Sequence, residues 1–148
     1  MDATIIISTY NRFQELEQTL GSFTRPENPV GSQWELIVVD NNSNDETKSI
    51  CDSFLDRLPL RYSFEAKQGK AIALNHAVDL AKGSLLLFTD DDVTLPPSWI
   101  ANYIRASKQY PDAQFFGGKV ISSWQQQPAQ WFVENAEWLR CNPRVDLG

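Results

Sequence analysis

Three adjacent aspartates, Asp90, Asp91 and Asp92, closely follow a short apolar run. Neighbouring carboxylates repel one another, and partial burial at a strand end raises their pKa values unless a cation is bound. Mg²⁺ and Mn²⁺ prefer hard oxygen ligands and commonly take one or two carboxylates together with phosphate oxygens. Solvated loop acids or helix caps fit less well, because Pro96 and Pro97 place the next helix start at least four residues later. The triplet therefore predicts a divalent-metal site that would neutralise a diphosphate.

Two other segments carry polar residues where a strand is expected to end: Ser8, Thr9, Tyr10, Asn11 and Arg12 in the first, and Asp40, Asn41, Asn42 and Ser43 in the second. Asp40 could accept hydrogen bonds from a ribose hydroxyl or a base N–H. It could equally form a turn before the two asparagines. Tyr10 could stack on a base or only cover the end of the sheet. Position alone leaves both pairs of alternatives open.

Further polar residues lie in a helix predicted farther along the chain. Lys70 follows Gly69 at the start of this helix and could meet a phosphate by charge, although a lysine in such a place is more often solvated. For Asn75 and His76, ordinary packing or exposure is the simpler interpretation. A catalytic Ser–His–Asp set would need His76, the single histidine, from inside a helix, which argues against such a set.

Strand and helix patterns alternate along the chain. Short β-branched runs predict strands, and apolar residues at helical spacing predict helices. The expected strands cover residues 3–8, 34–40, 60–65 and 84–89, with shorter ones at 114–116 and 119–122. Three helices are expected to start from a cap at Asn11, from a capping box at 43–46 and from the residues 96–98. Two more are expected at 70–82, with Gly83 as the stop, and at 128–139. This alternation predicts an α/β fold with a mostly parallel sheet flanked by helices, where ligands bind beyond the carboxyl ends of the strands.

Length and composition limit the classes of protein. With 148 residues, 42% of them apolar, the chain suits one globular domain. The net charge of −6 and the absence of a basic run argue against a nucleic-acid partner. No uninterrupted apolar run exceeds four residues and no signal peptide is evident, so we expect a cytoplasmic chain, with the inner face of a membrane as the alternative. One histidine and two distant cysteines, Cys51 and Cys141, argue against a zinc site, and Cys51 is expected to be buried.

Four segments together resemble family 2 glycosyltransferases with the GT-A fold: IIISTYNR at residues 5–12, VVDNNSNDET at 38–47, GKAIALNHAVDLAKG at 69–83 and LLLFTDDDV at 85–93. They occur in the family's order and at similar spacing, over roughly the first two-thirds of the chain. The resemblance implies a Rossmann-like, mostly parallel sheet flanked by helices. It also implies a nucleotide-diphosphate sugar as donor, with a UDP-sugar favoured, a saccharide or other hydroxyl acceptor, and Mn²⁺ or Mg²⁺ as cofactor.

The resemblance also assigns roles to individual residues. It places the family's Asp-x-Asp metal element on Asp90 and Asp92, with Asp92 as the main ligand and Asp91 in the variable middle position. The full set implied to bind the nucleotide sugar is Ser8, Thr9, Tyr10, Arg12, Asp40, Lys70, Asn75, Asp90 and Asp91. Asn41 and Asn42 replace residues that are often acidic or glycine in the family, which leaves the choice of nucleotide open.

The family's catalytic base, an Asp or Glu well downstream of the aspartates, has no matching motif in the 56 residues after Asp92. We expect the base to lie beyond Gly148, with the chain ending before the full acceptor-binding region. Within the chain, the candidates are Glu134 and Glu137. The leading hypothesis is metal-dependent sugar transfer with inversion, in which a base activates the acceptor hydroxyl. The alternative is a nucleotide-sugar-binding module without catalysis. A metal-dependent nucleotidyltransferase ranks last, because STYNR at residues 8–12 lacks the glycines of a phosphate loop.

Three tryptophans near the end of the chain recur every seven residues: Trp124, Trp131 and Trp138, with Phe132 and Leu139 extending the apolar face. They could pack on the domain's own sheet, stack on a sugar near the acceptor, or face a part that this chain lacks. An apolar patch larger than a few hundred Å² is rarely left bare on a soluble monomer. We therefore predict self-association through this segment.

Overall fold

The computed structural model describes residues 1–27, 31–121 and 129–135. The chain falls into two compact units, residues 1–111 and 112–148, each of which is described by itself. The first unit contains the sheet and most of the helices, and the second contains one short helix in its described part. The single domain from Met1 to Gly148 that the sequence suggests stays a prediction.

The sheet of the first unit is parallel throughout and confirms the expected fold class. Its strands are β1 (Ala3–Thr9), β2 (Trp34–Asp40), β3 (Leu60–Phe64) and β4 (Leu85–Thr89), in the order β3-β2-β1-β4. The register pairs Thr9 with Asp40, and Asp40 with Phe64. On the other side of β1, Ile7 pairs with Thr89. The carboxyl ends of all four strands therefore lie along one edge.

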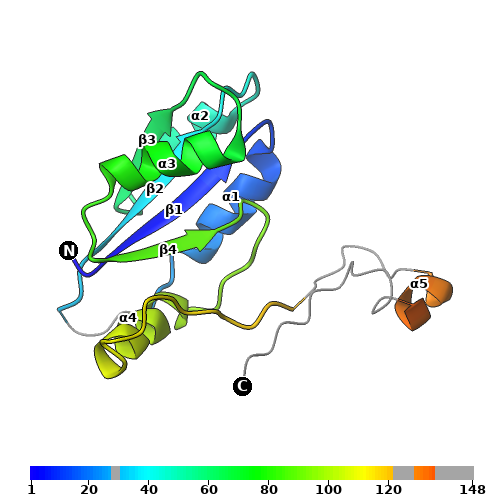
Figure 1. Cartoon of the computed structure of the whole chain (residues 1–148). Helices are drawn as coiled ribbons and strands as arrows, with labels where there is room; N and C mark the ends of the chain where they lie inside the picture. Colours follow the sequence, from blue (N-terminus) through cyan, green and yellow to red (C-terminus); the bar gives the residue numbers. More distant parts are fainter. Residues whose placement is uncertain (28–30, 122–128, 136–148) are drawn as a thin grey trace. The chain divides into compact units, whose positions relative to one another are not determined.

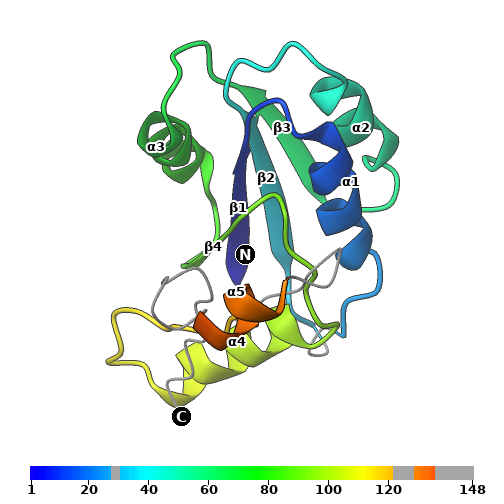
Figure 2. The same ribbon diagram turned by 90° about the vertical axis from the view of Figure 1, so that its right-hand side faces the viewer.

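Helices cover both faces of this sheet, as Figures 1 and 2 show. Helices α1 (Phe13–Ser22) and α2 (Thr47–Ser53) lie on one face, and α3 (Lys70–Leu80) lies on the other. Helix α4 (Trp99–Gln109) follows β4, and α5 (Gln130–Asn135) belongs to the second unit. None of the helices in the described ranges has the length and apolarity that a membrane crossing requires.

Alternation along the central strands creates two apolar clusters. Ile5 and Ile7 of β1 point toward the face covered by α1 and α2, whereas Ile6 packs with Ala73 and Ala77 of α3. All five side chains are fully buried. The small alanines let α3 approach the sheet closely, and each buried isoleucine stabilises the fold by about 1.5–3 kcal/mol. The sequence predicted these strands because both faces are buried and the runs are therefore uninterrupted.

Gly83 is not the helix stop that the sequence predicts. Helix α3 ends at Leu80, and Gly83 lies in the connection to β4. A Cβ atom on Gly83 would lie 2.3 Å from the backbone carbonyl carbon of Ala3. Its amide donates to Oγ1 of Thr4 at 2.8 Å. The glycine is therefore required because two backbone segments approach each other closely.

The short strands expected in the second unit are absent from its described part. Residues 114–116 form no strand, and within 119–121 only Val120 makes an isolated bridge. The two glycines at 117 and 118 weaken an extended segment because they contribute no side chain to pack, and Phe115 is 89% exposed. The helix expected at 128–139 corresponds to α5 (Gln130–Asn135), and residues 128 and 136–139 lie outside the described ranges. Residue 122, at the end of the second expected strand, also lies outside them.

Candidate functional site

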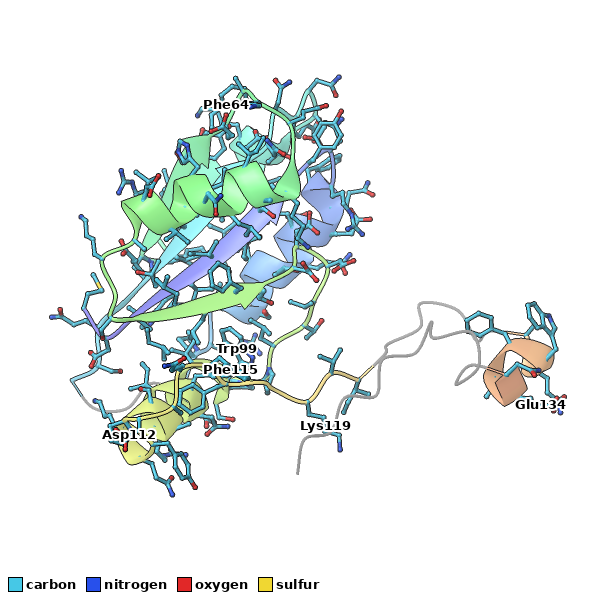
Figure 3. The ribbon with its side chains drawn as sticks, viewed as in Figure 1. Phe64, Trp99, Asp112, Phe115, Lys119 and Glu134 are labelled. Carbon is cyan, nitrogen blue, oxygen red and sulfur yellow. The ribbon has the colours of Figure 1, made fainter. Side chains whose placement is uncertain are left out.

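The carboxyl edge of the sheet brings together the loops that follow β1, β2, β3 and β4. The backbone amide of Asn41 donates to the carbonyl of Thr9, and that of Glu65 donates to the carbonyl of Asp40, so neighbouring loops continue the strand pairing. Phe64 ends β3 at this edge (Figure 3), and its exposed fraction is 49%. Ligands of parallel sheets bind at such an edge.

Asp91, the middle aspartate, points into the protein. Its side chain accepts a hydrogen bond from Oγ1 of Thr9 at 2.7 Å and one from Nη1 of Arg12 at 3.2 Å. Its backbone carbonyl accepts from Oγ1 of Thr19 at 2.8 Å. Burial raises the pKa of Asp91, although the Thr9 hydrogen bond and the charge of Arg12 act in the opposite direction. Asp91 therefore anchors the loop after β4 to β1 and α1.

Asp90 and Asp92 point outward and remain open to solvent. Their side chains are 58% and 44% exposed. Lys70 donates from Nζ to Oδ1 of Asp90 at 2.5 Å, and Arg12 donates from Nη2 to Oδ2 of Asp92 at 2.9 Å. Although burial lowers the pKa of Arg12, the charges of Asp91 and Asp92 raise it overall. Two basic side chains thus offset the repulsion among the three carboxylates.

The donor chemistry at this edge fits a divalent metal of the Mg²⁺ or Mn²⁺ class. Across the residues that the structure describes, no group of three or more His, Cys, Asp or Glu side chains gathers as a metal cage. Such a cage is not required, because these ions commonly take one or two carboxylates and complete their coordination with phosphate oxygens and water. Asp90 and Asp92 provide the two exposed carboxylates.

Asp40 is buried at the end of β2, with only 3% of its surface exposed. Its Oδ1 accepts from the backbone amide of Ser43, and its Oδ2 accepts from the hydroxyl of Tyr62, both at 2.8 Å. Burial and this hydrogen bond raise the pKa of Tyr62 above its usual range. Asp40 thus forms the turn that the sequence allowed. Each carboxylate oxygen retains a second lone pair, so a ligand contact is compatible with this turn.

Asn41 has a role that the sequence analysis missed. Its Oδ1 accepts from the backbone amide of Gly69 at 2.7 Å. Its Nδ2 donates to the carbonyls of Lys67 at 2.8 Å and Glu65 at 3.3 Å. This buried amide therefore joins the end of β2 to the segment that leads into α3, and it fixes the start of the helix at Lys70. An asparagine after a strand signals only a turn, so sequence spacing could not reveal this link.

Asp45 caps two helices, and the caps predicted from the sequence are wrong. Its Oδ2 accepts from the amide of Phe13 at the start of α1 at 3.2 Å, and its Oδ1 accepts from the amide of Thr47 at the start of α2 at 3.0 Å. Asn11 instead has a φ of 51° and accepts from the amide of Asn44, whereas Ser43 accepts from the amide of Asn11. Both residues join the two loops because their side chains find partners across them, not along a helix.

The remaining predicted donor residues lie in different environments. Ser8 is partly buried and Thr9 is buried, whereas Tyr10 is 48% exposed next to the joined loops. Asn75 is exposed on α3. His76 is within 2.8 Å of Oγ of Ser63 through Nε2 and within 3.0 Å of Oε2 of Glu65 through Nδ1. This Ser–His–Glu contact ties α3 to β3, which is the packing role expected for a helix histidine.

The second unit contains the two glutamates named as candidates for the base. Glu134 lies on α5 (Figure 3) and is exposed. Its Oε1 accepts a hydrogen bond from Nε2 of Gln130 at 2.9 Å. Trp131 is 63% exposed, and its ring lies edge-on to Phe132 with the ring centroids 5.8 Å apart. The other residues named from the sequence in this segment, Glu137, Trp124, Trp138, Leu139, Cys141 and Gly148, lie outside the described residues. A base beyond Gly148 therefore stays a prediction, as does a role for either glutamate.

Comparison with known proteins agrees with this arrangement. Validoxylamine A glucosyltransferase of Streptomyces hygroscopicus is 32% identical over 105 residues, which cover 70% of this chain and 25% of the relative. Among solved structures, the chain is similar to mannosyltransferase PcManGT from Pyrobaculum calidifontis in complex with GDP-Man and Mn²⁺. The two are 31% identical, with a TM-score of 0.65, and the match covers 71% of this chain and 32% of the PcManGT chain. TarS from S. aureus, in complex with UDP-GlcNAc, is 25% identical with a TM-score of 0.68. That match covers 75% of this chain and 32% of the TarS chain.

The chain spans about a quarter of the length of the first curated relatives that it matches. The sequence profile of glycosyl transferase family 2 matches residues 4–143. The match includes the carboxyl ends of all four strands and nearly the whole chain. The chain therefore belongs to glycosyl transferase family 2.

Proposed function

We propose that the carboxyl edge of the sheet is the donor site of a metal-dependent glycosyltransferase. The enzyme would transfer a sugar from a nucleotide-diphosphate sugar, with a UDP-sugar favoured, to the hydroxyl of a saccharide or another acceptor. One observation carries the proposal: the fold gathers an exposed aromatic ring, a buried oriented carboxylate, two basic side chains and two exposed carboxylates along one edge. These residues are Tyr10, Asp40, Lys70, Arg12, Asp90 and Asp92.

The residues of the edge divide into a nucleoside part and a diphosphate part. Tyr10 offers a half-exposed ring for the base, and Asp40 offers an oriented carboxylate for a ribose hydroxyl or a base N–H. Lys70 and Arg12 supply positive charge for phosphate oxygens. Asp92 and Asp90 would hold the metal, which stabilises negative charge on the departing diphosphate when it is bound.

The solved relatives support this choice of donor and cofactor. The PcManGT structure is a complex with GDP-Man and Mn²⁺, and the TarS structure is a complex with UDP-GlcNAc. Both ligands are sugars linked to a nucleoside diphosphate. The two basic side chains at the edge, together with a metal on the two carboxylates, would suit the common diphosphate. The choice between uracil and guanine depends on the nucleoside part.

Transfer with inversion would need a general base that accepts the proton of the acceptor hydroxyl. Glu134 and Glu137 are the candidates within this chain, and a residue beyond Gly148 in a longer natural protein is the other source. The alternative function is a nucleotide-sugar-binding module without catalysis. We favour transfer, because the metal-binding pair of carboxylates assists departure of a diphosphate and is not needed for binding a nucleoside alone.

The test is calorimetric binding of UDP and GDP to the chain with and without Mn²⁺, followed by a transfer assay with the matching nucleotide sugar. Binding that requires Mn²⁺ is the expected result. Asp40→Asn should weaken binding of both nucleotides while leaving the need for Mn²⁺ unchanged, because Asp40 lies in the nucleoside part. If neither UDP nor GDP binds at millimolar concentration, with or without Mn²⁺, the donor site is refuted. Binding without any transfer to a panel of hydroxyl acceptors would favour the binding module.

A further inference from the structure

The two exposed aspartates already have cationic partners from the chain itself. The ammonium of Lys70 contacts Oδ1 of Asp90 at 2.5 Å, and the guanidinium of Arg12 contacts Oδ2 of Asp92 at 2.9 Å. The four side chains are between 44% and 66% exposed, so both pairs are open to water and solutes. Exposed ion pairs of this kind are weak and exchange readily.

Each cation can leave its aspartate without disturbing the fold. Arg12 has a second anchor, because Nη1 donates to Oδ1 of the buried Asp91 at 3.2 Å. Lys70 is the first residue of α3, and the helix start is fixed through the contact between Gly69 and Asn41. The four-carbon stem of the lysine is flexible, so its ammonium can move while its backbone stays in place.

The charges at the edge suggest why the cations would move. Asp90, Asp91 and Asp92 outnumber Lys70 and Arg12 by one, so this group of side chains disfavours a diphosphate when no other cation is present. A divalent ion on Asp90 and Asp92 would reverse this local balance and favour a diphosphate. A divalent ion on Asp90 and Asp92 repels the ammonium of Lys70 and the guanidinium of Arg12 a few Å away. Binding of the metal therefore weakens both ion pairs and frees the two side chains to turn toward the incoming phosphates.

We propose that Lys70 and Arg12 are resident counter-ions, which a divalent metal displaces from Asp90 and Asp92 and which then bind the diphosphate of the donor. This inference rests on the proposed function, since it concerns the same metal and the same donor. It predicts that the two side chains oppose binding of the metal alone and favour binding of the nucleotide with the metal. Because coupling between ligands is reciprocal, each ligand then strengthens binding of the other.

The test measures the affinity of the chain for Mn²⁺ alone, from the electron paramagnetic resonance signal of free Mn²⁺. Lys70→Met is compared with Lys108→Met, because both lysines are 66% exposed and paired with a carboxylate. Lys108 pairs with Asp2 just before β1, at the opposite end of that strand from its carboxyl edge, so the control removes the same charge away from the site. Lys70→Met should bind Mn²⁺ about three- to tenfold more tightly than the control, since a competing positive charge a few Å from the ion is removed.

The second arm measures UDP at saturating Mn²⁺. Lys70→Met should bind UDP about tenfold more weakly than Lys108→Met, because a charged contact to phosphate is lost. Arg12→Gln is compared with Arg105→Gln on α4, and the folding of both is checked by circular dichroism. Like Lys70→Met, Arg12→Gln should bind Mn²⁺ more tightly and UDP more weakly than its control. Agreement between the two pairs would show that the effect belongs to the site and not to one lysine.

Separate outcomes distinguish this inference from the proposed function. If Asp92→Asn weakens Mn²⁺ binding but Lys70→Met does not strengthen it, the metal site stands and the counter-ion role is wrong. An unchanged UDP affinity in Lys70→Met would also overturn that role. If neither Asp90→Asn nor Asp92→Asn changes Mn²⁺ affinity, or if the wild type binds no Mn²⁺, the metal part of the proposed function fails and the inference fails with it.

Discussion

Asn41→Ala removes the side chain that joins the end of β2 to the segment before α3. Three hydrogen bonds are lost, to Gly69, Lys67 and Glu65. At about 1 kcal/mol each, with partial compensation by water, the free energy of unfolding should fall by about 2–3 kcal/mol. For a chain of this size, that corresponds to a melting temperature lower by about 4–10 °C. Urea unfolding, followed by circular dichroism, measures the change directly.

Two further variants test the reasoning behind this estimate. Asn75→Ala removes an exposed asparagine from α3 and should change the stability by no more than about 0.5 kcal/mol. Asn41→Asp keeps the acceptor for Gly69 but places a carboxylate against two backbone carbonyls, so it should be as destabilising as alanine at neutral pH. If Asn41→Ala is as stable as the wild type, the link between β2 and α3 contributes nothing and our account of the loop is wrong.

Three other predictions follow from the same structure. Gly83→Ala should lower the free energy of unfolding in urea by about 1–3 kcal/mol or more, because its Cβ would lie 2.3 Å from the backbone of Ala3. A variant as stable as the wild type would contradict this close approach. Burial raises the pKa of Cys51 to about 12, so in a Cys141→Ser variant this thiol should resist thiol reagents at pH 8. The free energy of unfolding should fall as the pH rises above about 9, because the thiol ionises in the unfolded chain before it does in the folded one. Rapid labelling of the folded chain would argue against burial. Trp131→Ser should reduce self-association in sedimentation at micromolar concentration, and a monomeric wild type would refute self-association.

Much of the fold could be predicted from the sequence because the central strands are buried on both faces. Uninterrupted apolar runs as short as residues 36–39 are typical of buried parallel strands, because a buried helix would need a longer run. The position expected for the candidate site rests on the same rule, since parallel strands end along one edge. The edge strand β3 was also found, because its alternation has one wetter face.

The internal arrangement of the site could not be predicted in the same way. Adjacent residues of a loop point in different directions. Three identical residues in a row therefore give no indication that Asp91 is buried and that Asp90 and Asp92 are exposed. The double cap by Asp45 joins residues that are 32 positions apart, and a capping box describes only contacts within one helix. Thr19, which holds the carbonyl of Asp91 from α1, carries no sequence signal because a threonine in a helix is ordinary.

The predictions for the second unit were less successful for a physical reason. Phe115 and Phe116, and Val120 and Ile121, are apolar residues suited to strands, but a strand forms only with a hydrogen-bonded partner. Sequence propensity describes one segment at a time and does not supply that partner. The self-association and the role of Glu134 therefore stay predictions that depend on experiments with the whole chain.

The central claim is that the carboxyl edge binds a nucleoside diphosphate through a divalent metal held by Asp92. The most direct measurement is thermal unfolding of the wild type and Asp92→Ala with UDP, each with and without Mn²⁺. We expect UDP at about 100 times its Kd to stabilise the wild type by about 2.7 kcal/mol in the presence of Mn²⁺. Asp92→Ala should remain folded, because Arg12 keeps its contact with Asp91, and it should lose the part of this stabilisation that depends on Mn²⁺. Equal stabilisation of both proteins by UDP and Mn²⁺, or none in the wild type, would contradict the account.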